Sequence, residues 1–349
     1  MKFGITLANR GILLGLASVP ELLALTDAVE ASPWLDSLWV GDALFVNRRL
    51  DAFTLLAALA GRTRRVLLGP ACMGSFALRD PRVFAYEWAS LDVLSGGRTR
   101  LAVCSGGGAG AAWDAETAAM GFAPAERRKR MIENIAVLRH LWTRDDAPFE
   151  GAFIRFSGVT LEPKPLQSPC PIWLTSNAGR LGNGQADAGG SDFVLRRVGR
   201  IADGWMTHSV SPDGFRRSWD TILQAGREAG RDVAGFDNVL CHHVNIAEDR
   251  EAALADAKRY LDLYYGANYS RERLEAWLAY GSPDAVVAQL RRYIGSGCNR
   301  ITFRLATMGD AMAQFRRLTE EVLPNLARGA GEACHRALDP VVEARQRRG

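Results

Sequence analysis

Residues 66–104 read VLLGPACMGSFALRDPRVFAYEWASLDVLSGGRTRLAVC and contain one complete strand–helix–strand unit. The short apolar runs at 66–73 and 99–104 are typical of buried strands. Between them, apolar residues recur at spacings of three and four, which predicts a helix with one apolar stripe. Asp80 directly before Pro81 marks the start of that helix, because aspartate caps a helix and proline fits its first turn.

The same unit recurs along the chain. Short apolar runs bounded by Gly or Pro alternate with longer helical patterns, which predicts eight parallel strands closed into a (β/α)8 TIM barrel. The alternative is a doubly wound open sheet, but no G-x-G-x-x-G fingerprint follows the first predicted strand. The predicted strands are residues 2–7, 37–40, 66–73, 99–104, 172–175, 204–206, 238–246 and 300–305.

Three segments are longer than a minimal barrel requires, and we expect them as insertions after strands four, five and seven. Residues 149–165 predict a small hairpin with strands at 153–156 and 159–161. Residues 177–192 are rich in glycine and predict a mobile loop. Residues 264–280 are rich in aromatic side chains and predict either a lid over an organic substrate or local packing on the barrel.

The chain shows no internal repeat and no linker. We therefore expect one barrel domain over residues 1–330, followed by a helical tail at 331–349.

Composition narrows the functional class. The 43 Lys and Arg residues are scattered among 39 Asp and Glu residues, a pattern that argues against nucleic-acid binding. No apolar run reaches the roughly 20 residues of a membrane span, and the chain opens directly on a predicted strand, so we expect a cytoplasmic protein without a membrane partner. The six cysteines form no C-x-x-C pair and no metal-like grouping with the histidines. Reduced thiols and no metal site follow, which argues against a metal-dependent barrel hydrolase.

Ten short phrases occur in the order found in the bacterial luciferase-like flavin-dependent oxidoreductase family, which the chain resembles from about residue 37 to residue 324. Each phrase alone is weak, but ten in order are hard to obtain by chance. They are SLWVGD at 37–42, RDP at 79–81, LDVLSGGR at 91–98, GF at 121–122 with ERR at 126–128, FEG at 149–151, LEPKP at 161–165, PIW at 171–173, ADGW at 202–205, GSP at 281–283 and EEVLP at 320–324.

The resemblance implies a flavin or deazaflavin across the C-terminal ends of the barrel strands. It also implies a non-proline cis peptide within residues 70–74, behind the cofactor ring. Two stretches of small residues, after the fifth strand and before a helix expected at Phe193, could offer backbone N–H groups to a phosphate. The candidate cofactor contacts are Ala71, Cys72, Met73, Cys104, Ser105, Gly106, Ser176, Asn177, Gly190 and Ser191.

The second strand departs from the family pattern. Many relatives carry a histidine after Gly-Asp or Gly-Glu, whereas this chain has Ala43, so that histidine's role cannot be carried over. The remaining candidates for acid and base work are Asp42, His208 and His242. Because side chains alternate along a strand, only one of His242 and His243 can face the barrel interior.

The family resemblance leaves two cofactors open. We favour reduced FMN, which activates dioxygen for insertion of one oxygen atom into a small organic substrate. Its supply by a separate NAD(P)H:flavin reductase is expected, because the chain shows no NAD(P)H fingerprint. The alternative is the deazaflavin coenzyme F-420, which only moves a hydride; a non-catalytic flavin-binding barrel is a third interpretation. The resemblance also implies a homodimer formed through helices near the second and third strands.

Overall fold

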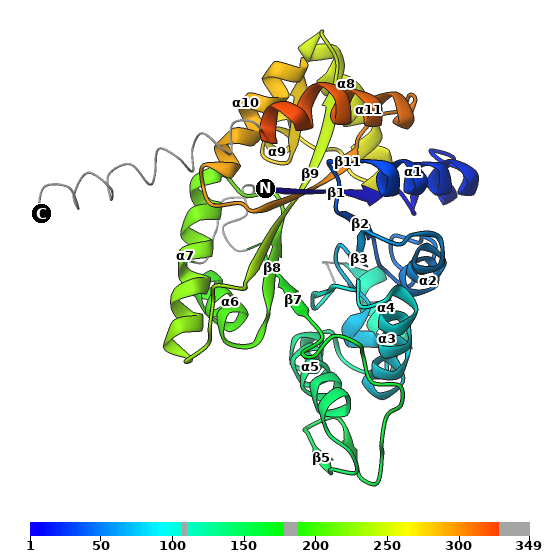
Figure 1. Ribbon diagram of the computed structural model, residues 1–349, viewed down its shortest axis with the longest axis vertical. Helices are drawn as coiled ribbons and strands as arrows, with labels where there is room; N and C mark the ends of the chain where they lie inside the picture. The colour runs from blue at the N-terminus through cyan, green and yellow to red at the C-terminus, as the bar shows by residue number, and fades with distance from the viewer. Residues whose placement is uncertain (107–109, 178–187, 328–349) are drawn as a thin grey trace, which may run out of the picture.

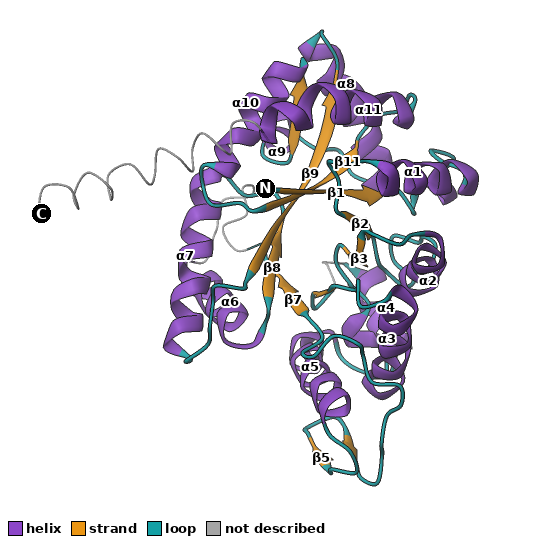
Figure 2. Cartoon of the chain, in the orientation of Figure 1, coloured by secondary structure: helices purple, strands orange, loops and turns teal. Residues whose placement is uncertain are grey.

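A computed structural model describes residues 1–106, 110–177 and 188–327 of the chain. The tail predicted at 331–349 and most of the predicted glycine-rich loop lie outside the described residues, as do the side chains of residues 188–191. Parallel strands form a barrel, and helices lie around its outside (Figure 1, Figure 2).

The barrel strands are those predicted from the sequence, with small shifts at their ends. They are β1 (Lys2–Leu7), β2 (Ser37–Val40), β3 (Leu67–Pro70), β4 (Leu101–Val103), β7 (Ile172–Thr175), β8 (Gly204–Thr207), β9 (Asp237–Ile246) and β11 (Arg300–Leu305). The larger helices are α1 (Val19–Ala31), α2 (Ala52–Arg62), α3 (Pro81–Ser95), α4 (Ala111–Ala119), α5 (Arg127–Thr143), α6 (Ala188–Ile201), α7 (Pro212–Glu228), α8 (Arg250–Tyr265), α10 (Pro283–Ile294) and α11 (Ala311–Arg317).

The strand order is β3-β2-β1-β11-β9-β8-β7-β4, and every pairing along it is parallel. Parallel bridges from Leu68 to Thr99 and from Met73 to Val103 join the two end strands. The N–H of Met73 donates to the carbonyl of Ala102 at 2.8 Å across this seam. The strands therefore close into a (β/α)8 barrel, as the sequence predicts, and not into an open sheet.

Two predicted helix starts have the expected caps. Asp80 accepts a hydrogen bond from the N–H of Arg82 at the start of α3, and Ser211 accepts one from Gly214 at the start of α7. These caps satisfy N–H groups that a helix end leaves without partners. By contrast, α6 begins at Ala188, five residues before Phe193, so Gly190 and Ser191 lie in its first turn.

The hairpin prediction was wrong in its register. Its strands are β5 (Phe149–Glu150) and β6 (Arg155–Phe156), so the turn spans residues 151–154 and does not contain Ser157. The cause is Glu133 on α5, whose carboxylate accepts hydrogen bonds from the N–H groups of Ala152, Phe153 and Ile154 at 2.6–2.8 Å. A distant carboxylate therefore fixes this turn.

The aromatic segment forms an addition to the seventh strand. It contains α9 (Arg271–Glu275) and β10 (Leu278–Gly281), and β10 pairs with residues 243–246 of β9 outside the barrel path. Local packing on the barrel is confirmed for part of the segment, whereas the lid stays a prediction. Tyr264 and Tyr280 are buried in a local apolar cluster, whereas Tyr265, Tyr269 and Trp277 line a cavity at the top of the barrel.

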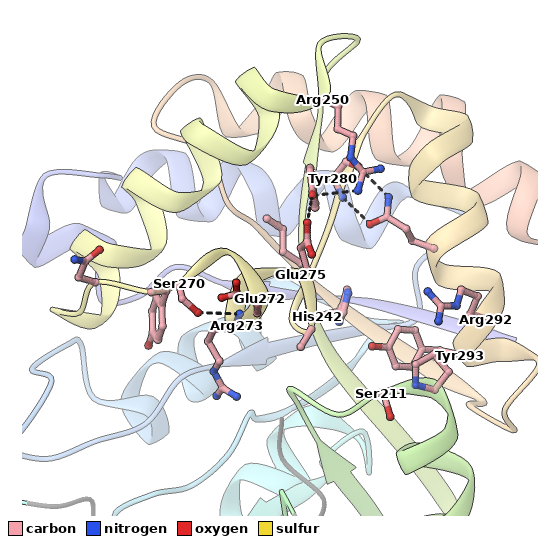
Figure 3. Close-up of a pocket in the computed structure, with 16 residues that line it drawn as sticks. Ser211, His242, Arg250, Ser270, Glu272, Arg273, Glu275, Tyr280, Arg292 and Tyr293 are labelled. Atoms are coloured by element: carbon pink, nitrogen blue, oxygen red, sulfur yellow. Dashed lines mark hydrogen bonds between the residues drawn. The ribbon is translucent and has the colours of Figure 1, made fainter. Parts of the chain in front are cut away.

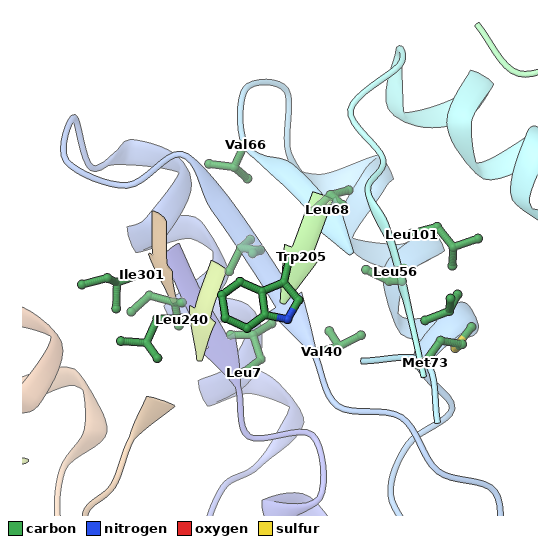
Figure 4. Close-up of a cluster of buried hydrophobic side chains, with 14 of the residues drawn as sticks. Leu7, Val40, Leu56, Val66, Leu68, Met73, Leu101, Trp205, Leu240 and Ile301 are labelled. Atoms are coloured by element: carbon green, nitrogen blue, oxygen red, sulfur yellow. The ribbon is translucent and has the colours of Figure 1, made fainter. Parts of the chain in front are cut away.

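The main core fills the space between strands and helices (Figure 4). On β11, Ile301 and Phe303 belong to this core, whereas the alternate residue Thr302 faces the barrel interior and bonds Thr6 at 2.9 Å. A smaller cluster inside the barrel includes Trp39 and Trp173, whose ring centroids lie 5.5 Å apart. Among the described residues, no helix has the length and apolar character of a membrane span.

Candidate active site

A cavity of about 590 Å³ opens at the C-terminal ends of the barrel strands. This is the end where barrel enzymes place their working groups, and the volume suits an organic ligand. Its lining comes from the ends of β2, β3, β4, β7, β8, β9 and β11, with further residues from the segment around α9. The site is therefore shared by strands far apart in the sequence.

Small residues form one side of this cavity, here termed the small-residue floor: Ala71, Cys72, Gly74, Cys104, Ser105 and Gly106. A Cβ atom on Gly106 would lie 1.9 Å from the carbonyl oxygen of Gly74, and Gly106 has a φ of +60°. Only glycine suits both conditions. The non-proline cis peptide implied by the family resemblance lies here, between Ala71 and Cys72.

Six of the ten predicted cofactor contacts line the cavity: Ala71, Cys72, Cys104, Ser105, Gly106 and Asn177. Met73 does not, because its side chain is fully buried in the core with Leu56 and Leu101. Ser176 is also buried, and its carbonyl accepts a hydrogen bond from the Trp205 indole at 3.1 Å. Gly190 and Ser191 lie in the first turn of α6, where side chains are outside the described residues.

Cys104 has the properties of a packing residue. Its hydrogen bond with Cys72, together with burial, raises the pKa of the Cys104 thiol well above its ordinary value. A protonated thiol is a poor nucleophile. The sequence-based interpretation of Cys104 as a ring contact fits this position better than a covalent role.

Asp42 reaches the cavity from the end of β2. Its side chain is fully buried, and its Oδ2 accepts a hydrogen bond from the N–H of Ser75 at 2.7 Å. Arg79 lies 3.8 Å from Oδ1, which has no hydrogen-bond partner among the described residues. Burial raises the pKa of Asp42 above its ordinary value, although Ser75 and Arg79 act in the opposite direction. Asp42 can therefore hold or accept a proton at Oδ1.

His208 lies at the end of β8 in a fixed orientation. Its Nε2 is 2.7 Å from the Asn177 amide nitrogen, and its Nδ1 is 2.8 Å from the Ser209 hydroxyl. If the amide donates to Nε2, the proton of the neutral ring lies on Nδ1. The ring also stacks obliquely near Trp277, with centroids 5.3 Å apart.

The neighbouring histidines on β9 separate as alternation predicts. The ring of His243 lies 4.4 Å from Trp277 inside the cavity, and neither ring nitrogen has a partner among the described residues. His242 turns toward the helix layer, where its ring centroid is 5.3 Å from that of Tyr293 on α10. His243, which was the less favoured candidate, is thus the histidine with its ring among the cavity residues.

Several lining residues were not predicted from the sequence. Arg304 on β11 lines the cavity, and so do Thr175, Met206 and Cys241 on other strands. Glu116 on α4 also contributes; its Oε1 accepts hydrogen bonds from the N–H groups of Phe45 and Val46, and Oε2 pairs with Arg127 at 2.7 Å. The one available signal was alternation on the final strand, which places Arg304 on the same side as Thr302.

A second, larger space of about 1130 Å³ lies outside the barrel, between α9, β10 and α10 (Figure 3). Side chains of both signs of charge line this space: Arg250 and Arg292 are positive, and Glu272 and Glu275 are negative. Arg250 and Glu275 already share the Tyr280 hydroxyl, at 3.1 and 2.8 Å. We place the candidate site in the smaller cavity, because that one lies at the strand ends.

Comparison with known proteins decides the family. The sequence profile of the luciferase-like monooxygenases matches residues 1–300. The chain belongs to the luciferase-like monooxygenase family. The barrel, the small-residue floor and the position of the cavity are those expected for an oxidoreductase of this family.

Proteins similar to this chain are named for different reactions. An F420-dependent glucose-6-phosphate dehydrogenase of Amycolatopsis mediterranei is 27% identical over 84% of this chain and 90% of the relative. An F420-dependent secondary alcohol dehydrogenase, solved with an F420-acetone adduct, has a TM-score of 0.77 at 17% identity, covering 93% and 98% of the two chains. Monooxygenase RslO1 from Streptomyces bottropensis has a TM-score of 0.74 at 23% identity, covering 93% and 99%. At these identities the two structures show the shared fold.

Proposed function

We propose that this luciferase-like protein is a deazaflavin-dependent oxidoreductase, which moves a hydride between coenzyme F-420 and a small organic substrate. The observation that carries the proposal is the similarity over most of the chain to a dehydrogenase named for this coenzyme. It favours the alternative of the sequence analysis over reduced FMN. When bound, a deazaflavin accepts or donates a hydride and does not form the oxygen adduct of a reduced flavin.

The cavity residues fit a flat tricyclic cofactor. On the small-residue floor, a ring can approach the backbone at Gly74 and Gly106 without meeting a bulky side chain. Asp42 Oδ1 and Thr175 Oγ1 are buried at this cavity and have no hydrogen-bond partner among the described residues. Such buried atoms gain a partner when a polar ligand binds, which supports the assignment of the cofactor to this cavity.

We assign to Asp42 the role of the base that accepts the hydroxyl proton of the substrate. Oxidation of an alcohol releases the hydroxyl proton together with the hydride, so a nearby base is required. Asp42 is suited to this role because Oδ1 accepts no hydrogen bond from the described residues, with Arg79 as an ion-pair partner 3.8 Å away, while the Ser75 N–H holds Oδ2 in place. His208 forms hydrogen bonds with Asn177 and Ser209 and so holds these two side chains in place. In relatives with Gly-Asp-His, the histidine is the candidate for this role. This chain has Ala43 at that position, so the role would fall to Asp42.

A monooxygenase using reduced FMN is the second candidate. The monooxygenase RslO1 shares the fold, and Tyr265, Tyr269 and Trp277 give the cavity aromatic lining, which would suit the protection of a reactive oxygen adduct from water. That reaction would need dioxygen and the separate reductase described above.

One binding experiment separates the candidates. The purified full chain is titrated with oxidised coenzyme F-420 and with FMN, followed by the change in cofactor fluorescence. We expect F-420 to bind at least about tenfold more tightly, a difference of about 1.4 kcal/mol, and to be reduced when a secondary alcohol substrate is added. Asp42→Asn should keep the affinity for F-420 and lose the reduction. Preferential binding of FMN, with oxygen consumption after its reduction, would establish the second candidate instead.

For quaternary structure we propose a homodimer through α3. Val83, Tyr86 and Leu94 are exposed on this helix at spacings that place them on one face. Exposed apolar residues gathered on one helix face favour a protein partner.

A further inference from the structure

Two arginines on β11 differ in their partners. Arg300 and Arg304 are both buried, and they lie on the inward row of the strand with Thr302 between them. Arg300 forms a hydrogen-bonded ion pair with Asp36, and Asp237 lies 3.8 Å away. Arg304 has no carboxylate within ion-pair distance among the described residues. A buried cation without an anion is costly, so the position of Arg304 calls for a negative charge from elsewhere.

The surroundings of Arg304 hold the guanidinium but leave its charge uncompensated. Its Nη1 donates to the Tyr265 hydroxyl at 2.6 Å, and its Cζ lies 4.5 Å from the ring centroid of Tyr264. Its Nε is buried without an acceptor among the described residues. One edge of the guanidinium is therefore held by a phenol, whereas the buried Nε has no acceptor among the described residues.

His243 lies next to Arg304 in the barrel interior. Arg304 and His243 are paired in register on the adjacent strands β11 and β9, so their side chains project from neighbouring positions on the inward face. Both ring nitrogens of His243 lack a partner among the described residues. Burial, followed by the charge of Arg304, lowers the pKa of His243 well below its ordinary value. The pair thus offers one positive charge and one neutral N–H donor.

We propose that Arg304 and His243 bind a carboxylate group of the organic substrate, so that this protein acts on a small hydroxy or oxo acid. A carboxylate carries one negative charge and two oxygen atoms, which match one guanidinium and one neutral imidazole. A phosphate monoester carries nearly two negative charges at neutral pH, one more than the single positive charge of Arg304. The proposal rests on the proposed hydride-transfer function, in which substrate and cofactor share the cavity.

The test compares two probes of equal size, benzoate and the neutral benzamide, on the full chain with and without oxidised F-420. Binding is followed by calorimetry and by tryptophan fluorescence, since Trp277 adjoins His243. We expect benzoate to bind at least about tenfold more tightly than benzamide, as a charge-assisted contact provides. Inorganic phosphate should displace benzoate only weakly. Equal affinity for the two probes, or stronger binding of phosphate, would overturn the carboxylate assignment.

Variants assign the preference to the residues. Arg304→Gln should abolish the preference for benzoate, whereas Arg304→Lys and His243→Phe should each retain part of it. Tyr265→Phe removes the phenol that holds Arg304 but keeps the charge, and it should therefore weaken the preference less than Arg304→Gln does. Loss of F-420 affinity in Arg304→Gln with an unchanged benzoate preference would assign Arg304 to the cofactor and overturn the inference. If Arg304→Gln does not fold, the wild-type preference for benzoate over benzamide still tests whether the cavity binds a carboxylate.

The two proposals can fail separately. A protein that does not bind F-420 but prefers benzoate through Arg304 would contradict only the proposed cofactor. A protein that binds F-420 and treats benzoate and benzamide alike would contradict only the carboxylate site.

Discussion

Arg300 and Arg304 lie four residues apart on the inward row of β11, and of the two only Arg300 is in an ion pair with described carboxylates. This difference predicts opposite effects on stability. Arg300→Met leaves Asp36 without its partner and should lower the free energy of unfolding by about 2 kcal/mol, since Asp36 is partly exposed. Arg304→Met removes an uncompensated charge and should change it by less than about 1 kcal/mol. Denaturant unfolding of the ligand-free variants measures both, and equal losses would contradict a ligand-binding role for Arg304.

Substitutions at Gly106 and Gly266 distinguish the cost of a steric clash from the cost of a strained backbone conformation. Both have positive φ, but a Cβ on Gly266 would meet nothing within 4 Å, whereas one on Gly106 would collide with Gly74. Gly266→Ala should cost about 1 kcal/mol of stability. Gly106→Ala should cost roughly 1–3 kcal/mol more and weaken F-420 binding, because the floor must shift. Thermal unfolding and cofactor titration test the pair; equal costs would place Gly106 outside any close approach.

The buried pair of Arg127 and Glu116 supports the loop that follows Asp42. Both side chains are at least nine-tenths buried, and Glu116 also accepts the N–H groups of Phe45 and Val46. Arg127→Met should lower the free energy of unfolding by about 3–5 kcal/mol, because it leaves a buried carboxylate unpaired. The double variant Arg127→Met/Glu116→Gln should recover part of this loss. A double variant as unstable as Arg127→Met would show that the carboxylate charge is not the cause.

His242 makes stability depend on pH. Burial lowers its pKa from 6.5 to about 3, so the unfolded chain binds the proton more tightly and stability falls as pH drops below 6.5. At pH 5 this residue should cost about 2 kcal/mol relative to pH 7. His242→Phe keeps a ring beside Tyr293 and should reduce the loss of stability between pH 7 and pH 5 by that amount. Denaturant unfolding at both pH values, with the wild-type chain as reference, provides the comparison; an equal loss of stability in the wild type and in His242→Phe would show that the pKa of His242 is the same in the folded and unfolded chains.

The proposed dimer predicts a response at α3. Leu94→Arg should place a charge within the apolar face and shift the protein toward monomer in sedimentation velocity. Leu13→Arg, at an exposed leucine outside α3, is the control and should leave the sedimentation coefficient unchanged. A wild-type protein that sediments as a monomer would contradict the proposed homodimer.

The sequence by itself determined the barrel and the helix starts at Asp80 and Ser211, and it placed the small residues around Gly106 directly after a barrel strand. These features depend on local information: hydrophobic period, capping chemistry and the rule that functional residues follow barrel strands. The hairpin shows the limit, because its turn is fixed by Glu133 on a helix that precedes it and not by the turn residues themselves.

Only the tertiary structure decided which polar groups meet in the cavity. His243 and Arg304 are about sixty residues apart in the chain and become neighbours through the register of β9 against β11. Strand register depends on the packing of the whole barrel, so neither the pairing nor the absence of a described carboxylate beside Arg304 could be derived from periodicity. The chain therefore specified where a cofactor could lie, whereas the fold brought together the two groups of the proposed carboxylate site.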